Sequence, residues 1–372
     1  MKIAIVCYPT FGGSGVVATE LGIALSKRGH EIHFVTYKQP VRLEYLSSSI
    51  HYHEVLVPEY PLFHYQPYEL ALSSKLVRVV QKHKIDILHV HYAIPHAYAG
   101  FMAQQMLLEE GMKLPMMTTL HGTDITLVGS HSFYKPAVNF SINKSDIVTS
   151  VSESLKNDTL DIFDIKKKIE VVPNFIDISN LKESFEDCKR HMVAFEDEKV
   201  ITHVSNLREV KRLTDVIEIF YRIQSKIKSR LIIVGDGPDR EKAANLAKDL
   251  NIKDRVIFLG KSNEVERILC YSDLFLLPSE KESFGLAALE AMAHRVPIIS
   301  SNVGGLPEVN KHGISGYLSN VGDIDDMAQN GIKILSDDNV LNKFKAGARA
   351  IAEQFDVERV VCQYEKLYQK MI

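Results

Sequence analysis

The sequence predicts an α/β protein made of two parallel-sheet domains in series. Short runs rich in β-branched residues alternate with amphipathic segments of roughly 10 to 16 residues, which is typical of strands joined by helical crossovers. This alternation restarts once, near residue 198, and a chain of 372 residues is too long for one ordinary core.

The first domain is predicted over residues 1–172. Its strand–helix alternation favours right-handed βαβ crossovers and therefore a parallel sheet. The strands are expected at Lys2–Cys7, Glu31–Thr36, His51–Val57, Asp86–His91, Met116–Leu120, Asp146–Val151 and Glu170–Val172. The helices are expected at Gly15–Arg28, Tyr68–His83, His96–Glu110, Phe133–Asn143 and Glu153–Phe163.

The second domain is predicted over residues 198–356, after a charged and aperiodic linker at 173–197. The strands are expected at Val200–Ser205, Arg230–Val234, Val256–Leu259, Leu274–Leu277 and Ile298–Ser300. The helices are expected at Leu213–Lys226, Asp239–Leu250, Asn263–Cys270, Gly285–Ala293, Ile324–Leu335 and Val340–Gln354. A last helix, about 357–372, can pack back on the first domain. Two such domains normally face each other across a ligand-binding cleft.

Composition narrows the function classes. The formal net charge is −3 and no block of one sign stands out, so nucleic acid is not an expected partner. No apolar run approaches the roughly 20 residues of a membrane-spanning helix, and no membrane partner is expected. The four cysteines are scattered without zinc-site spacing, which predicts free thiols in a reducing compartment and a cytoplasmic protein. Oligomeric state is left open.

The stretch from Ser279 to Glu290 is the strongest functional signal. It follows a predicted strand and opens a helix at Gly285, where free N–H groups and the helix dipole favour an anion. Two carboxylates, Glu282 and Glu290, lie eight residues apart across that boundary. Glu290 lies too far into the helix for phosphate but is suited to ribose hydroxyls. The stretch therefore predicts half of a sugar-nucleotide site.

A basic loop follows the first strand of the second domain. Arg208 and Lys211 can clamp a diphosphate there, whereas Arg212, at the helix start, fits a surface role. Gly235 follows the next strand and either admits a base or sugar to the backbone or serves packing alone. The Gly304-Gly305 pair, after a later strand, is open to the same two interpretations.

The first strand ends in a glycine-rich turn. Residues 13–18, Gly-Ser-Gly-Val-Val-Ala, fit the G-x-G-x-x-A pattern of dinucleotide-binding folds. The second strand ends without the acidic residue that an NAD site requires, which weakens an NAD(P)-dependent oxidoreductase as an alternative. Backbone amides of Gly13 and Ser14 facing an anion remain an interpretation, beside a packing role for the glycines.

Polar residues also end two other predicted strands of the first domain. His121 ends one of them and is followed by Gly122, Thr123 and Asp124, and this setting favours a functional role for His121. His89, His91 and His96 cluster near the end of another strand. They have no carboxylate or cysteine to complete a ligand set, so no metal is expected there. Tyr92, at the strand tip, is the better ligand candidate.

Taken together, these motifs resemble the retaining glycosyltransferases of family 4, which have the GT-B fold of two Rossmann-like domains. The resemblance covers nearly the whole chain and is most specific at Glu282-x7-Glu290. More narrowly, four segments resemble the branch that joins N-acetylglucosamine from UDP-N-acetylglucosamine to L-malate, the first step of bacillithiol biosynthesis: Gly12–Gly15, His91–His96, Thr119–Asp124 and His203–Asn206.

The resemblance implies roles for individual residues. On the donor side, Glu290 should hold the ribose, and the amides of Phe284, Gly285 and Leu286 should meet the diphosphate together with Lys211. Glu282 and His121 should lie by the transferred sugar, and Gly13 should face the phosphate. Many members carry Arg where this chain has Asn206, and Arg208 is the candidate replacement. The carboxylates of malate need donors, for which the candidates are Ser14, Tyr92, Thr119, Thr123 and Arg208.

The resemblance also implies a mechanism without metal or cofactor, in which cations and backbone amides stabilise the leaving phosphate. Retention in this family is thought to proceed on one face of the sugar, so Glu282 and Glu290 are not interpreted as a glycosidase acid/base pair. The alternatives are a family 4 enzyme with a lipid or polysaccharide acceptor, the oxidoreductase, and a non-catalytic two-lobed binding protein. The absence of a basic amphipathic face favours a small acceptor.

Overall fold

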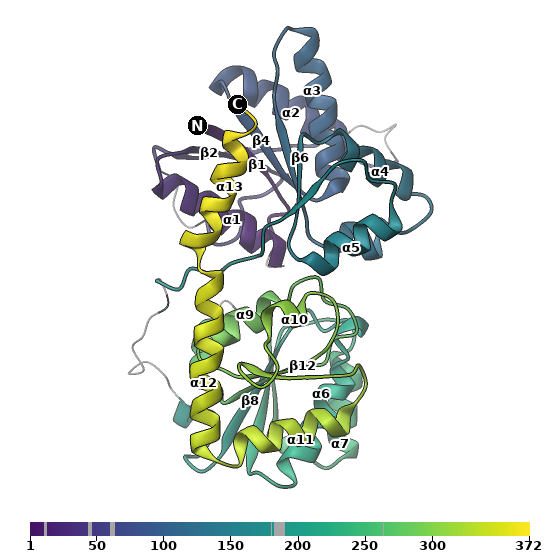
Figure 1. Cartoon of the computed structure of the whole chain (residues 1–372). Coiled ribbons are helices and arrows are strands. Elements are labelled where there is room, and N and C mark those ends of the chain that lie inside the picture. Colours follow the sequence, from purple (N-terminus) through teal and green to yellow (C-terminus); the bar gives the residue numbers. More distant parts are fainter. Residues whose placement is uncertain (11–12, 44–46, 60–63, 180, 182–189, 263) are drawn as a thin grey trace. The chain divides into compact units, whose positions relative to one another are not determined.

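The computed structural model describes residues 1–10, 13–43, 47–59, 64–179, 181, 190–262 and 264–372. The chain divides into two compact units (Figure 1). Unit 1 comprises Met1–Asn174 together with Val357–Ile372, and unit 2 comprises Phe175–Asp356. The C-terminal helix therefore belongs to the first unit.

Unit 1 is built on a seven-stranded parallel sheet with the order β3-β2-β1-β4-β5-β6-β7. Its strands are β1 Lys2–Val6, β2 Glu31–Thr36, β3 Ile50–Glu54, β4 Ile87–His91, β5 Met116–Leu120, β6 Ile147–Ser150 and β7 Ile169–Val171. Its α-helices are α1 Gly13–Lys27, α2 Tyr68–His83, α3 Tyr98–Glu109, α4 Lys135–Lys144, α5 Glu153–Ile162 and α13 Val357–Gln369. The central strands are fully buried, as expected where helices cover both faces.

Helix α13 packs beside α1 (Figure 1), and both ion pairs and buried side chains hold it in place. Arg28, just after α1, donates to Glu358 at 2.8 Å and to Glu365 at 2.9 Å. On the inner face of α13, Tyr364 and Tyr368 are almost completely buried. The Tyr368 hydroxyl lies 2.7 Å from His89 Nδ1, which links this helix to the core of the sheet.

Unit 2 repeats the plan with a six-stranded parallel sheet in the order β10-β9-β8-β11-β12-β13. Its strands are β8 Lys199–Val204, β9 Ser229–Val234, β10 Val256–Gly260, β11 Leu274–Leu277, β12 Ile298–Ser301 and β13 Gly316–Ser319. Its α-helices are α6 Leu213–Gln224, α7 Arg240–Asp249, α8 Val265–Cys270, α9 Leu286–Ala293, α10 Leu306–Val309, α11 Ile324–Leu335 and α12 Asp338–Ala352.

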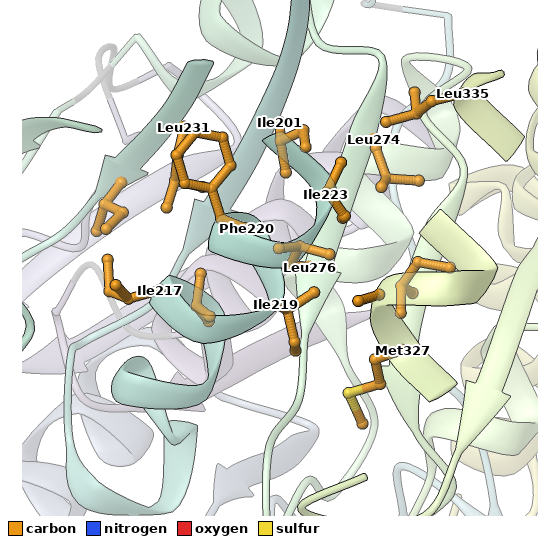
Figure 2. Packing of buried hydrophobic residues seen from close by; sticks show 14 of the residues in the cluster. Ile201, Ile217, Ile219, Phe220, Ile223, Leu231, Leu274, Leu276, Met327 and Leu335 are labelled. Carbon is orange, nitrogen blue, oxygen red and sulfur yellow. The ribbon is translucent and has the colours of Figure 1, made fainter. Parts of the chain in front are cut away.

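The core of unit 2 lies between the sheet and helices α6 and α11 (Figure 2). The buried stripe of α6 includes Ile217, Phe220 and Ile223, whose helical spacing places them on one face against Ile201 and Leu231 of the strands. Because this packing fixes β8 beside β11, the loops that leave the carboxyl ends of those two strands become neighbours.

The predicted elements are present, with ends that shift by a few residues. Among the described strands and α-helices, β13 and α10 were missed, and both are only four residues long. One expectation is wrong: Cys7 and Cys362 are free thiols, but Cys270 is disulfide-bonded. Within the described ranges, no helix is both long and apolar enough to cross a membrane.

Candidate functional site

In unit 2, the loops after β8 and β11 are joined by an ion pair. Lys211 Nζ donates to Glu282 Oε2 at 2.6 Å, and each side chain is less than a fifth exposed. The Ser279 hydroxyl donates to the same carboxylate oxygen at 3.4 Å. The backbones are tied as well, because the Glu280 N–H donates to the Val210 carbonyl at 2.8 Å. The structure thus brings together two residues that the sequence analysis assigned to one site.

The N-terminus of α9 opens directly beside this pair. Gly285 has a φ of 97° and precedes the helix, and a Cβ at this position would lie 2.7 Å from Leu306 Cδ2. Phe284 is buried and packs edge-to-face on Phe355, with ring centroids 5.7 Å apart. The conformation of this turn is therefore set by the positive φ of Gly285 and by the packing of Phe284 on Phe355. The first amides of α9, from Leu286 onward, have no carbonyl acceptor within the helix and can bind an anion.

A second turn, at Gly304 and Gly305, packs against the backbone of the Glu282 loop. The Gly305 N–H donates to the Glu282 carbonyl at 2.9 Å. Gly304 has a φ of 55°, and a Cβ there would overlap the same carbonyl oxygen. The sequence analysis left the role of this glycine pair open. The structure assigns it to packing against the backbone of Glu282, and two adjacent glycines after a strand were the signal that could have found it.

The remaining unit 2 candidates have different surroundings. Arg208 is exposed, and its guanidinium makes no hydrogen bond or ion pair in the part of the chain that the structure describes. Arg212 donates to Asp215 at 2.6 Å, a local pair that fits a surface role. Gly235 has a φ of 121°, and a Cβ there would overlap the Ser205 carbonyl, so close packing already requires this glycine. Glu290 is half-buried on α9.

In unit 1, three hydroxyl groups from three different loops converge. The Tyr92 hydroxyl donates to Ser14 Oγ at 2.7 Å, and the Thr123 side chain lies close enough to lower the pKa of Tyr92 slightly against the effect of burial. Burial raises the pKa of Tyr92, so its hydroxyl remains a protonated donor. The loops follow β1, β4 and β5, which are neighbours in the sheet. Gly13 is exposed at the start of α1, and Gly12 lies outside the described residues.

His121 directly follows β5 and lies against a stack of buried imidazoles. His121 Nε2 and His91 Nδ1 share a hydrogen bond of 2.8 Å, and the His121 ring centroid is 5.2 Å from that of Tyr92. Burial lowers the pKa of His121 to about 3, and the charge that His96 would carry acts in the same direction. His121 is therefore neutral near pH 7 and can exchange hydrogen bonds with a sugar hydroxyl without acting as an imidazolium acid.

Thr119 lies behind His121, in the interior of the sheet. Its side chain is fully buried, and its hydroxyl lies 2.7 Å from both His89 Nε2 and Thr149 Oγ1. The Thr119 side chain therefore positions His89, a member of the histidine stack, through a hydrogen bond within the sheet. Its assignment as an acceptor ligand remains a prediction, but the burial favours a positioning role.

Asp124 connects the loops after β4 and β5. Its carboxylate accepts from the Ala93 N–H at 2.9 Å and from the Gly122 N–H at 3.0 Å. Burial raises the pKa of Asp124 to about 6, against the lowering effect of these backbone donors. Sequence reasoning noticed Asp124 only as a neighbour of His121. The structure shows that it holds the Tyr92 turn and the His121 turn together.

Comparisons with known proteins agree with this geometry. Residues 11–180 match the family model described as "Glycosyltransferase Family 4", and residues 184–351 match "Glycosyl transferases group 1". The chain is 48% identical over 370 residues to the N-acetyl-alpha-D-glucosaminyl L-malate synthase of Bacillus anthracis, covering 99% of this chain and 96% of that protein. An uncharacterised glycosyltransferase of Methanocaldococcus jannaschii is 28% identical over 91% of this chain and 90% of its own length.

Solved structures share the fold at low identity. Anabaena HepE in complex with UDP-glucose has a TM-score of 0.84 at 21% identity, and each chain is covered completely. The sucrose-phosphate synthase of Thermosynechococcus elongatus has a TM-score of 0.82 at 19% identity, with 100% of this chain and 98% of that chain covered. The predicted GT-B architecture of two Rossmann-like domains is thereby confirmed. With both halves matched and a relative at 48% identity along the whole chain, the protein belongs to the family 4 glycosyltransferases.

Proposed function

We propose that this chain moves N-acetylglucosamine from UDP-N-acetylglucosamine to the hydroxyl of L-malate with retention at the anomeric carbon, as the cytoplasmic first step of bacillithiol biosynthesis. The proposal is supported by the 48% identity to a protein named for N-acetylglucosaminyl transfer to L-malate, which extends over 99% of the chain. The structural observation that carries it is the Lys211–Glu282 pair beside the N-terminus of α9.

The donor diphosphate belongs at that helix N-terminus. Lys211, the exposed Arg208 and the first amides of α9 would supply positive charge where the leaving phosphate accumulates negative charge. Glu282 orients the Lys211 ammonium and is available to the hydroxyls of the sugar. Glu290 would hold the ribose from within the helix.

The proposed transfer needs no covalent intermediate between the sugar and the enzyme. The bond between the anomeric carbon and the β-phosphate oxygen breaks, and a bond from the same carbon to the malate oxygen forms on the same face of the sugar. The proton of the malate hydroxyl passes to the departing phosphate oxygen. No step needs a carboxylate nucleophile, and a neutral His121 suits a hydrogen-bonding role beside the sugar.

Unit 1 would supply the acceptor contacts. Malate carries two carboxylates, and charge-assisted hydrogen bonds from hydroxyl groups can bind them. The side chains of Ser14, Tyr92 and Thr123 already converge at the strand ends, with Tyr92 kept protonated by burial. The amides at Gly13 and Ser14 would add donors at the start of α1.

The direct test measures UDP release from UDP-N-acetylglucosamine with L-malate, D-malate, L-lactate or citrate as acceptor. We expect release and a glycosylated product with L-malate, and unchanged rates in EDTA. UDP release with a lipid or polysaccharide acceptor, but not with L-malate, would contradict the acceptor assignment. It would still agree with membership of the glycosyltransferase family. NAD(P) binding without sugar transfer would contradict the proposal as a whole.

Lys211→Ala tests the role of the ion pair. Removing one preorganised donor from developing charge should lower kcat by roughly 10²- to 10³-fold. The matched control is Lys226→Ala, which removes an exposed lysine from the same unit and should leave the rate unchanged. An equal small effect of both substitutions on kcat would contradict a role for Lys211 in leaving-group stabilisation.

A further inference from the structure

Unit 1 contains a second cluster of titratable side chains, away from the residues described above. His33 of β2 is paired in register with His51 of β3, and His53 lies two residues further along the same strand. In a parallel sheet this spacing places all three on one face. His83, the last residue of α2, covers that face. The rings of His53 and His83 both lie about 5 Å from the ring of His33, centroid to centroid.

The donor atoms of three of these histidines are close enough to hold one ion. His33, His53 and His83 each offer a ring nitrogen within 4.8 Å of the others. His33 Nδ1 lies 2.8 Å from His53 Nε2. Two imidazole nitrogens on one tetrahedral Zn²⁺ stand about 3.3 Å apart, given Zn–N bonds of about 2.0 Å. The site thus needs to open by about half an ångström to admit the ion.

The opposite nitrogen of His33 completes a pattern typical of metal-binding histidines. His33 Nε2 lies 3.0 Å from Glu31 Oε1, so an N–H at this position donates to the carboxylate and leaves Nδ1 with its lone pair facing His53. The Lys2 ammonium lies 3.2 Å from the other oxygen of Glu31 and holds that carboxylate in place. A carboxylate behind a buried histidine fixes both its tautomer and its orientation.

The donor set also suits a metal. Imidazole nitrogens coordinate metal ions in their neutral form. Three imidazole ligands with solvent in a fourth position suit Zn²⁺ and neighbouring first-row divalent ions, whereas Mg²⁺ and Ca²⁺ require oxygen ligands.

We propose that His33, His53 and His83 form a binding site for Zn²⁺ or a similar divalent transition-metal ion, with Glu31 as the outer carboxylate. The ion would join the edge strand β3 and the end of α2 to β2. His33, His53 and His83 belong to β2, β3 and α2, while Tyr92 and His121 follow the carboxyl ends of β4 and β5. The proposed ion would therefore join three elements of unit 1 that carry neither Tyr92 nor His121.

The test uses full-length protein stripped with a chelator and titrated with Zn²⁺ against a chromophoric competitor. We expect one tight equivalent per chain, a rise in Tm on adding Zn²⁺, and a tetrahedral visible spectrum with Co²⁺. His53→Ala should weaken Zn²⁺ binding at least tenfold and abolish the Tm shift. Glu31→Gln should weaken binding by roughly 10- to 100-fold.

Two controls separate this site from other histidine sites. His131→Ala removes an exposed histidine of the same unit, and His51→Ala removes the ring on the Glu31 side of His33; both should retain the tight equivalent. Loss of binding in His51→Ala with retention in His53→Ala would overturn the proposed ligand set. Equal Zn²⁺ affinity in wild type and His53→Ala, with both folded by circular dichroism, would overturn the proposal.

Discussion

Lys211 and Glu282 lie 71 residues apart in sequence and 2.6 Å apart in the structure. Because the ammonium already donates to a carboxylate, a donor diphosphate must compete with Glu282 or share Lys211 with it. If the donor binds as proposed, a sugar hydroxyl that bonds to Glu282 would weaken its hold on Lys211 and free the ammonium for the phosphate. The proposed function thus predicts that binding of the sugar is coupled to stabilisation of the leaving group.

At the same scale, Glu290→Ala should weaken UDP binding roughly ten- to a hundredfold, because the ribose loses hydrogen bonds to a charged acceptor. Calorimetric titration with UDP measures the change in Kd. Glu241→Ala, on the exposed side of α7, is the matched control. Equal UDP affinity in wild type and Glu290→Ala would show that Glu290 does not hold the nucleotide.

At the scale of elements, the site depends on loops that support one another. The β11–α9 loop is tied to the loop after β8 by a side-chain ion pair and by a backbone hydrogen bond. It is supported from its other side by the Gly304–Gly305 turn after β12. In unit 1, Asp124 plays the corresponding role between the loops after β4 and β5. Each loop of the candidate site is therefore held by a loop from a neighbouring strand.

Gly304→Ala tests this support. Its Cβ would collide with the Glu282 carbonyl, so the β11–α9 loop must shift and transferase activity should fall at least tenfold. Gly313→Ala is the control, because Gly313 also has a positive φ, 78°, but a Cβ there meets nothing within 4 Å. Both substitutions should lower the free energy of unfolding by about 1–2 kcal/mol through the left-handed backbone. Full activity in folded Gly304→Ala would contradict the supporting role.

At the scale of the whole molecule, buried histidines make the two units respond differently to acid. Burial lowers the pKa of His89 and His121 to about 3 and of His96 to about 4, and it lowers the pKa of His91 well below its usual range. All four belong to unit 1. In unit 2, the described histidines with lowered pKa are His203, at about 4, and His294.

The direction in which stability changes with pH follows from the difference in bound protons between the folded and the unfolded chain. Below about pH 6.5 the unfolded chain takes up protons on histidine while these folded rings do not, so stability is full above that pH and is lost as pH falls toward 4. At pH 5.5 the loss is about 1 kcal/mol for each ring. Asp124, with a raised pKa, offsets a small part of this below about pH 6. Unit 1 should therefore weaken more than unit 2.

Hydrogen exchange resolved by peptide, at pH 7.5 and pH 5.5 in EDTA and corrected for intrinsic rates, measures this difference. Protection should fall mainly in unit 1: in β4, β5 and α13, which surround the four rings, and in β2 and β3, where burial also lowers the pKa of His33 and His53 to about 4. Equal loss of protection in both units, or unchanged protection at pH 5.5, would contradict the buried neutral state of these histidines.

The sequence by itself determined the two parallel sheets, nearly all of their elements and the loops that carry the candidate site. Periodicity is a local property, and in a parallel sheet every strand end reaches the same edge, so Tyr92, His121, Lys211 and Glu282 could be assigned to loops in advance. The short elements β13 and α10 escaped because four residues carry too little periodicity.

Only the tertiary structure decided which of these side chains meet. The Lys211–Glu282 pair, the convergence of hydroxyls on Tyr92 and the burial of Thr119 depend on strand order and loop conformation. The histidine cluster at His33, His53 and His83 is the clearest case, because its members come from two strands and a helix whose register no local pattern encodes. Contacts between distant residues are set by the packing of whole elements, and that packing is a property of the folded chain.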